Sequence, residues 1–238
     1  MTGPNEAAPG KAAPSETARA TAGALMDIEA VLFRPEDPFI FTSGRASPVY
    51  VDCRRLISFP RERARLMDLA VALIDEAIGR DAIDVVAGGE TAGIPFAAWI
   101  AERLDKPMVY IRKKPKGFGR NAQIEGTFAE GARVLLIEDL ATDGGSKLNF
   151  IEAVRNAGGE IAHAFVIFHY GIFPQSVSAL AERGVTLHAL ATWWDALAVA
   201  EARGYLSGDG LRDVRAFLYD PETWSAAHGG KTSADIGG

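Results

Sequence analysis

The residues with the clearest chemical potential are two adjacent carboxylates and the polar loop that follows them. Glu138 and Asp139 come directly after an apolar run, and residues 142–146 contain two hydroxyls and two glycines. Gly144 and Gly145 permit a ligand to approach the backbone closely, and N–H groups at the start of a helix bind anions. Two carboxylates beside an anion would repel it unless a sugar diol, a bound Mg²⁺ or a cationic transition state lay between them. The pattern therefore favours a phosphate-binding site over a plain glycine-rich turn.

The elements around this stretch predict how it is positioned. The apolar run 134–137 is typical of a strand buried on both faces of a parallel sheet, and residues 147–156 have the pattern of an amphipathic helix. Strand-like and helix-like segments alternate on both sides, which indicates an α/β fold with a doubly wound, mostly parallel sheet flanked by helices. In such sheets ligands bind at the carboxyl ends of the strands, where the acid pair lies. The other expected strands are 83–87, 108–111, 161–168 and 185–190.

The ends of the chain have a different organisation. We expect a disordered tail at 1–17, where Ala, Pro, Gly and Thr dominate, and a loose C-terminal tail at 222–238. Between them, residues 18–221 predict a single domain, in which 18–59 form a small piece ahead of the main sheet. The expected elements of that piece are a helix at 18–33 and short strands at 39–41 and 49–52.

Two further loops are candidate sites. Residues 112–120 carry five cations between two expected strands, which predicts a mobile lid that closes on a polyanionic substrate. The alternatives for this loop are a solvated surface loop and a nucleic-acid patch with Phe118 as a stacking residue. Residues 88–95 follow a strand and open a helix, so their backbone N–H groups could bind a second anion such as a pyrophosphate.

The remaining reactive side chains favour structural roles. Cys53 is the one cysteine of the chain, so an intramolecular disulfide and a cysteine-based zinc site are excluded. Cys53 lies in an apolar alternating run, which predicts a half-buried structural thiol. His163 and His169 flank an apolar strand without the spacing of a metal site, which predicts structural histidines with satisfied hydrogen bonds. Asp195 is expected in the first turn of a helix, where the helix dipole favours an acid.

Composition and missing motifs disfavour several classes of protein. The net charge of −6 argues against binding to nucleic acid. The sequence has no P-loop lysine motif, no GxGxxG with a downstream ribose acid and no GxSxG elbow, which weakens nucleotide triphosphatase, dehydrogenase and α/β-hydrolase interpretations. No run of about 18 apolar residues occurs, and the N-terminal segment lacks a hydrophobic signal core, which predicts a cytoplasmic protein that does not contact membranes.

Four segments carry a resemblance to a known family. Residues 138–146, an acid pair followed by a Thr/Gly/Ser loop, are similar to the phosphoribosyl pyrophosphate signature of the class I phosphoribosyltransferases. Residues 41–54 resemble the N-terminal hood segment of the branch of this family that acts on orotate. Residues 112–116 and 125–126 resemble the catalytic loop of that branch and the strand after it. The resemblance extends over about 25–219 and implies the class I phosphoribosyltransferase fold, with 18–59 as the hood.

The resemblance also implies an activity and its components. Such an enzyme transfers the 5-phosphoribosyl group from phosphoribosyl pyrophosphate to orotate, giving orotidine 5′-monophosphate and pyrophosphate in pyrimidine biosynthesis, with Mg²⁺ bound through the substrate. It implies a homodimer whose catalytic loop serves the neighbouring subunit's site. Lys116, Glu138 and Asp139 would be catalytic, and Thr142 and His169 would lie near the base. The residues implied to bind phosphoribosyl pyrophosphate are Arg112, Lys113, Lys116, Glu138, Asp139, Leu140, Ala141, Thr142, Asp143, Gly144, Gly145 and Ser146.

The chain departs from the family pattern at three places. Phe118 stands where the catalytic loop often has a histidine, and Thr42 stands where the hood segment has a lysine. Residues 169–171 occupy the place of the arginine that usually recognises the base. A bidentate arginine is the natural partner of a carboxylate such as that of orotate, so backbone N–H groups, His169 or Arg45 would have to replace it.

Two alternative functions stay open. The missing arginine would permit another base, such as a purine, although the hood segment favours orotate. A non-catalytic regulator that binds phosphoribosyl pyrophosphate would need a nucleic-acid surface, and the N-terminal region is too short and too poor in cations to supply one. The presence of Lys116 and of both carboxylates favours catalysis.

Overall fold

The fold comes from a computed structural model, which describes residues 13–117, 123–142, 145–232 and 235. The chain forms two compact units. Cys53–Leu190 makes up the first, called here the sheet unit; Met1–Asp52 and Ala191–Gly238 together make up the second, called here the terminal unit. Cys53 is fully buried, at 1% exposure, rather than half-buried as its sequence context predicted.

A six-stranded sheet organises the sheet unit, with the strand order β10-β9-β8-β5-β6-β7. The pairs β5–β6, β5–β8 and β8–β9 are parallel, whereas β7 pairs antiparallel with β6. The sheet is therefore mixed and mostly parallel, as the alternation of strand-like and helix-like segments predicted. The strands are β5 (Val85–Gly89), β6 (Met108–Ile111), β7 (Ile124–Glu125), β8 (Arg133–Ala141), β9 (Glu160–His169) and β10 (Thr186–Thr192).

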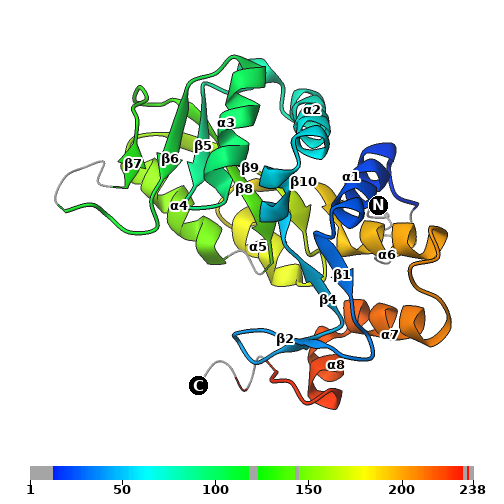
Figure 1. Ribbon diagram of the computed structural model, residues 1–238. Helices are drawn as coiled ribbons and strands as arrows, with labels where there is room; N and C mark the ends of the chain where they lie inside the picture. The colour runs from blue at the N-terminus through cyan, green and yellow to red at the C-terminus, as the bar shows by residue number, and fades with distance from the viewer. Residues whose placement is uncertain (1–12, 118–122, 143–144, 233–234, 236–238) are drawn as a thin grey trace, which may run out of the picture. The chain divides into compact units, whose positions relative to one another are not determined.

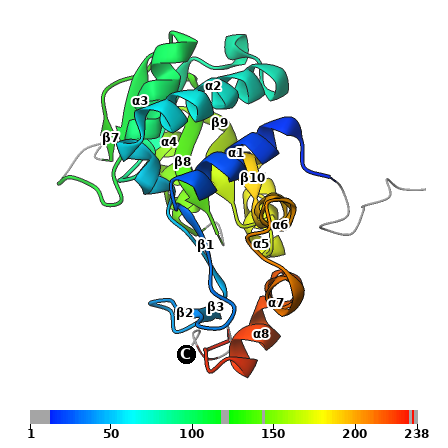
Figure 2. The ribbon, with the colours of Figure 1, turned by 45° about the vertical axis from the view of Figure 1, so that its right-hand side comes forward.

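Helices cover both faces of this sheet (Figure 1, Figure 2). They are η1 (Cys53–Ser58), α2 (Pro60–Ala77), η2 (Arg80–Ala82), α3 (Gly93–Leu104), α4 (Gly145–Asn156) and α5 (Pro174–Ala181). Two neighbouring glycines of β5 show which helix covers which face, because consecutive strand residues point to opposite faces. A Cβ on Gly88 would meet the Ile94 Cα of α3 at 2.8 Å, whereas a Cβ on Gly89 would meet the Phe150 Cε2 of α4 at 2.7 Å.

The core on the α4 face explains why this helix is fixed in place. Phe150, Ile151 and Val154 of α4 are all buried and belong to one apolar cluster with Val134 and Leu136 of β8. Burying a side chain of this kind contributes about 1.5–3 kcal/mol relative to leaving it exposed. The first turn of α4 is thereby held next to the carboxyl end of β8.

Strand β8 is longer than the sequence pattern predicted. We expected the strand to end at Ile137 with the acid pair beyond it, but it continues to Ala141, which pairs with His169 of β9. The apolar run marks only the part of the strand that is buried on both faces, and the hydrogen-bonded ladder carries the strand further. The acid pair therefore lies within the strand, with Glu138 and Asp139 on opposite faces of the sheet.

The terminal unit combines elements from both ends of the chain. Its contacts include the packing of α1 against α6, an ion pair from Arg203 Nη1 to Asp27 Oδ1 at 2.7 Å, and an edge-on contact between the Phe33 and Trp193 rings. Its elements are α1 (Glu16–Asp27), β1 (Val31–Phe33), β2 (Phe39–Ile40), β3 (Ala46–Ser47), β4 (Val49–Val51), α6 (Trp193–Ala202), α7 (Gly208–Tyr219) and α8 (Pro221–Ala227).

The helix expected at 18–33 is shorter than predicted. It ends at Asp27 because the chain turns at Glu29, which has a φ of 55°. Residues Val31–Phe33 then form β1, which pairs antiparallel with Val49–Val51 of β4. The apolar residues in this part of the sequence fit both a helix face and a short strand, and the tertiary pairing decides between them.

The expected tails differ in their outcome. The segment predicted to be loose, 222–238, is helical over most of its first part, because Pro221 opens α8 and Asp220 caps it by accepting from the Thr223 N–H. Trp224 of this helix is buried. Of the tail expected at 1–17, residues 1–12 lie outside the described residues. Among the helices that the structure describes, none combines the length and the hydropathy that a bilayer crossing requires.

Candidate functional site

Glu138 lies beneath α4, on the same face of β8 as Val134 and Leu136. Its side chain is only 9% exposed. The glycine at position 89 makes room for it, because a Cβ there would lie 2.6 Å from Glu138 Oε1. The carboxylate is thus packed between β5 and α4, and its position depends on both.

Lys147, which the sequence pattern did not single out, lies against this carboxylate. Its Nζ donates to Glu138 Oε2 at 2.9 Å and to the Leu140 carbonyl oxygen at 2.7 Å, and its side chain is 2% exposed. From the sequence we expected a sugar diol, Mg²⁺ or a cationic transition state beside the acid pair and not a cation of the chain itself, although a lysine in the first turn of a helix was a usable signal. The positive end of the helix dipole disfavours a cation there unless an anion lies close by.

Asp139 lies on the opposite face of β8 from Glu138. Burial raises the pKa of its carboxyl and the charge of Glu138 raises it further, whereas the charges of Lys147 and of Arg54 on η1 lower it. A buried acid whose pKa is raised, and which is acted on by a second acid and two cations at the carboxyl end of a strand, is typical of a functional group rather than of a solvated one.

The loop after β8 is described in part. Thr142 is half-buried, and Gly145 and Ser146 open α4, while Asp143 and Gly144 lie outside the described residues. The first N–H groups of a helix have no carbonyl partner within the helix. The start of α4 therefore lies where the sequence predicted an anion site, directly after the acid pair.

The basic loop is held at its start by the loop after β5 and by helix α4. The Lys113 N–H donates to Glu90 Oε2 at 2.7 Å, and Asn149 Nδ2 of α4 donates to the Lys113 carbonyl oxygen at 3.0 Å. Glu90 belongs to the segment 88–95 that was predicted to bind a second anion. The structure therefore brings the segment 88–95, the start of the basic loop and helix α4 together at the carboxyl ends of β5, β6 and β8.

Glu125 of β7 holds two cations of the basic loop. Lys116 Nζ donates to its Oε1 at 2.9 Å and Arg112 Nη1 donates to the same oxygen at 3.4 Å. The hydrogen bond from Lys116 is the main reason why the pKa of the Glu125 carboxyl is lowered. Any anion that binds these cations has to compete with Glu125. Phe118 lies outside the described residues.

His169 ends β9 beside Ala141 of β8. Its Nε2 lies 3.0 Å from Ser176 Oγ, and burial together with the charge of Lys147 lowers its pKa. The ring is therefore neutral near pH 7 and offers hydrogen bonds but no charge to a ligand carboxylate. Arg45, the other side chain considered for that purpose, is ion-paired with Glu222 in the terminal unit.

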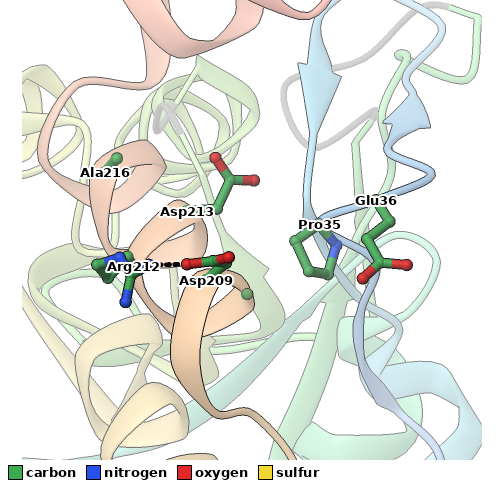
Figure 3. Close-up of a pocket in the computed structure, with 7 residues that line it drawn as sticks. Pro35, Glu36, Asp209, Arg212, Asp213 and Ala216 are labelled. Carbon is green, nitrogen blue, oxygen red and sulfur yellow. Dashed lines mark ion pairs between the residues drawn. The ribbon is translucent and has the colours of Figure 1, made fainter.

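A pocket in the terminal unit contains none of the predicted site residues. It has a volume of about 480 Å³ and lies between the segment after β1 and helix α7 (Figure 3). Its lining includes Glu36 and Asp213, and Arg212 is ion-paired with Asp209 (Figure 3). This acidic lining does not suit a phosphorylated ligand.

Comparison with known proteins decides the family. A model of the phosphoribosyl transferase domain matches residues 58–193. The orotate phosphoribosyltransferase of Dinoroseobacter shibae is 58% identical over 214 residues, which cover 90% of this chain and 95% of that protein. The chain belongs to the orotate phosphoribosyltransferase family.

Solved structures of the orotate phosphoribosyltransferase family confirm the predicted fold class. The enzyme from Aeropyrum pernix aligns with a TM-score of 0.63 at 34% identity, covering 78% of this chain and 99% of that one. The Mycobacterium tuberculosis enzyme in complex with 5-phospho-alpha-D-ribosyl 1-diphosphate aligns with a TM-score of 0.57 at 26% identity, covering 75% and 98%. The resemblance drawn from residues 138–146 and the hood segment is thus correct at the level of the family.

Proposed function

We propose that this chain transfers the 5-phosphoribosyl group from phosphoribosyl pyrophosphate to orotate, giving orotidine 5′-monophosphate and pyrophosphate in pyrimidine biosynthesis. The observation that carries this proposal is the 58% identity to an orotate phosphoribosyltransferase over 90% of the chain. The site geometry supports it, because a phosphorylated sugar needs an anion site next to hydrogen-bond acceptors for its hydroxyls. The start of α4 and the acid pair of β8 are neighbours of this kind.

The acid pair acts on the ribose. The reaction breaks the bond between C1 of the ribose and pyrophosphate while a nitrogen of the base attacks C1, so positive charge develops on the ring. Glu138 and Asp139 accept hydrogen bonds from the ribose hydroxyls and place negative charge near that ring. Residues 142–146 and the first N–H groups of α4 hold the 5′-phosphate, which fixes C1 relative to the base.

The basic loop acts on the leaving group. Arg112, Lys113 and Lys116 stabilise the negative charge that develops on pyrophosphate, and closure of the loop excludes water. Lys116 and Arg112 leave Glu125 in order to do so. Removing one such cation raises the barrier by about 3 kcal/mol, by analogy with the loss of one oxyanion-hole donor.

The chemistry of the donors near the acid pair fits Mg²⁺. This ion prefers carboxylate and phosphate oxygens and keeps several waters. Within the described ranges, no three His, Cys, Asp or Glu side chains come together as a metal-binding group. Mg²⁺ would therefore be held mainly by the substrate, with Glu138 and Asp139 as the neighbouring carboxylates, and when bound it neutralises charge on the pyrophosphate.

The proposal also covers the residues that contact the base, the oligomeric state of the enzyme and its location in the cell. Thr142 and His169 lie at the carboxyl ends of β8 and β9 and are the side chains proposed to contact the base. His169 contributes hydrogen bonds rather than charge. The enzyme is a homodimer in which the loop at 112–116 serves the partner's site, and it is cytoplasmic.

The test is an ultraviolet assay of orotate loss with phosphoribosyl pyrophosphate and Mg²⁺, run beside adenine, guanine, hypoxanthine and uracil. We expect turnover of orotate alone, a loss of about 100-fold in Lys116→Ala, and unchanged turnover in the control Lys106→Ala, which lies outside the basic loop. If a purine is turned over instead, the substrate is that purine and not orotate. If the protein binds phosphoribosyl pyrophosphate but turns over none of these bases, the proposed enzymatic function fails and the protein is a non-catalytic regulator.

The shared loop has its own test. Lys116→Ala and Asp139→Asn each inactivate a homodimer, but a mixed dimer contains one site with a wild-type loop and a wild-type acid pair. Mixing the two inactive variants after mild dissociation should therefore restore activity. Failure to restore activity in a mixture that forms mixed dimers would refute the shared site.

A further inference from the structure

We propose that Lys147 is a positioning residue: it locks Glu138 and the Leu140 carbonyl at the carboxyl end of β8, and its positive charge lets an acid pair lie next to a phosphate-binding loop. This inference rests on the proposed function. It names a residue outside the segment 138–146 that carries the family resemblance.

Placing the Lys147 ammonium in this position costs free energy, so the position depends on the contacts that the ammonium makes there. Its side chain is 2% exposed, and removing an ammonium from water is expensive unless a partner is close and well oriented. It also lies in the first turn of α4, where the helix dipole disfavours a cation. Two hydrogen bonds, to Glu138 Oε2 at 2.9 Å and to the Leu140 oxygen at 2.7 Å, reduce both costs.

These contacts connect the two elements that bound the phosphate loop. Glu138 and Leu140 belong to the end of β8, and Lys147 belongs to the start of α4, so the lysine connects the two elements on either side of residues 142–146 in the chain. Gly89 completes the arrangement, because the absence of a Cβ leaves space for Glu138 Oε1. The ends of the loop are thus fixed relative to each other by one buried ion pair.

The charge of Lys147 also reaches the second acid. The charged groups that act on Asp139 are Glu138 on its own strand, Lys147 on α4 and Arg54 on η1. Burial and Glu138 raise the pKa of Asp139, while the two cations lower it. Loss of Lys147 therefore raises this pKa further, and Asp139 stays protonated up to a higher pH. Because an ionised Asp139 is needed to oppose positive charge on the ribose, activity should be lost first at low pH.

The experiment is the pH profile of kcat/KM for phosphoribosyl pyrophosphate, with orotate saturating, in wild type and three variants. Lys147→Met removes the charge and keeps the length of the side chain. We expect a loss of about tenfold or more at pH 6 and a smaller loss at pH 8.5, so that the acidic limb moves to higher pH. Glu138→Gln removes the opposing charge, so its acidic limb moves to lower pH. In the double variant the two effects on Asp139 offset each other, and the limb returns towards that of wild type.

The matched control is Arg155→Met, which removes a cation from the last turn of the same helix, where Arg155 bonds to the Arg183 carbonyl. Its pH profile should superimpose on that of wild type. Thermal unfolding and the affinity for phosphoribosyl pyrophosphate, measured by calorimetry, accompany each profile. Lys147→Met should unfold at a lower temperature than the double variant, because it leaves Glu138 buried without a partner.

The outcomes separate the proposal from its premise. If wild type does not turn over orotate, the proposed function fails, whatever the variants do. If wild type is active and the limb of Lys147→Met does not move, Lys147 has only a packing role and the proposal is overturned. If Lys147→Met does not fold, the comparison of Glu138→Gln with the double variant decides, because equal limbs in these two would likewise overturn it.

Discussion

Gly93 is the residue at which one added carbon should disturb the site most clearly. It is the first residue of α3, and a Cβ there would lie 2.4 Å from the Ile137 carbonyl oxygen and 3.2 Å from the Glu138 Cα. Both neighbours are backbone atoms of β8, so no side chain can rotate away. In Gly93→Ala the helix and the strand must therefore separate.

The size of the effect follows from these distances. Contacts of a Cβ below 3.0 Å do not occur in practice, so α3 has to move from β8 by about 0.6 Å or more. Overpacking of this kind costs about 1–3 kcal/mol, which for a chain of this length lowers Tm by roughly 2–12 °C. Because Glu138 is one of the two residues pushed, we also expect kcat/KM to fall by about tenfold or more.

The assay is thermal unfolding by circular dichroism together with the orotate assay. Gly210→Ala is the control, because Gly210 lies within α7 and its added Cβ would meet its nearest neighbour, Pro35 Cγ, at 3.3 Å. This contact is with one side-chain atom rather than with backbone, and it is longer by about 0.9 Å than the closest contact at Gly93, so the variant should lower Tm by less than Gly93→Ala does and leave kcat/KM unchanged. A Gly93→Ala protein with unchanged Tm and activity would refute the reasoning, since it would mean that α3 does not press on the acid pair.

Three other changes probe the loop, the histidines and a helix cap. Glu125→Gln weakens the ion pair that holds Lys116. Because an exposed ion pair contributes only about 0–1 kcal/mol, the KM for phosphoribosyl pyrophosphate should fall by up to about fivefold in steady-state kinetics. A rise in KM would contradict competition between Glu125 and the substrate. Burial lowers the pKa of His163 and of His188, whose nitrogens Nδ1 and Nε2 lie 3.1 Å apart, below the ordinary value of about 6.5. The folded state favours the neutral form of both rings, so their contribution to the free energy of unfolding is complete above about pH 6.5 and is lost as the pH falls through their lowered pKa values. Tm should therefore drop below about pH 6.5, and His163→Gln should make this drop less steep. An equally steep drop in the variant would rule out the histidine pair as its cause. Thr192→Ala removes the hydroxyl from the capping box of α6 and should lower the unfolding free energy in urea by about 1 kcal/mol, whereas no change would mean that the cap is dispensable.

The sequence was most informative where several physical signals agreed. The sheet was predictable because continuous apolar runs such as 134–137 alternate with amphipathic segments. The true end of β8 was not, since its last residues are held by pairing with β9 rather than by their own composition. Helix α8 was missed for the opposite reason: its start at Pro221 follows a capping aspartate, a local signal that a polar composition obscured.

The candidate site was predictable in its parts and less so in its connections. Residue types alone indicated an anion loop, an acid pair and a basic loop. The buried pair of Lys147 and Glu138 depends on two elements meeting in space, although the lysine in the first turn of a helix was a usable signal. The tie between Glu90 and the Lys113 N–H joins loops that are far apart in the chain, and no local pattern predicts it.

The composition of the terminal unit has a consequence for synthesis on the ribosome. Its closing contacts join residues that are far apart in the chain: Ser225 Oγ accepts from the Ala46 N–H across 179 positions, and Arg203 donates to Asp27 across 176. The sheet unit, by contrast, is one continuous stretch, Cys53–Leu190, and can fold as soon as it has emerged. At about 5–20 residues per second, the N-terminal segment waits several seconds longer for the last helices. During that interval α1 and the edge of β1 are exposed, so the newborn chain is most open to chaperones and proteases at the end that was made first.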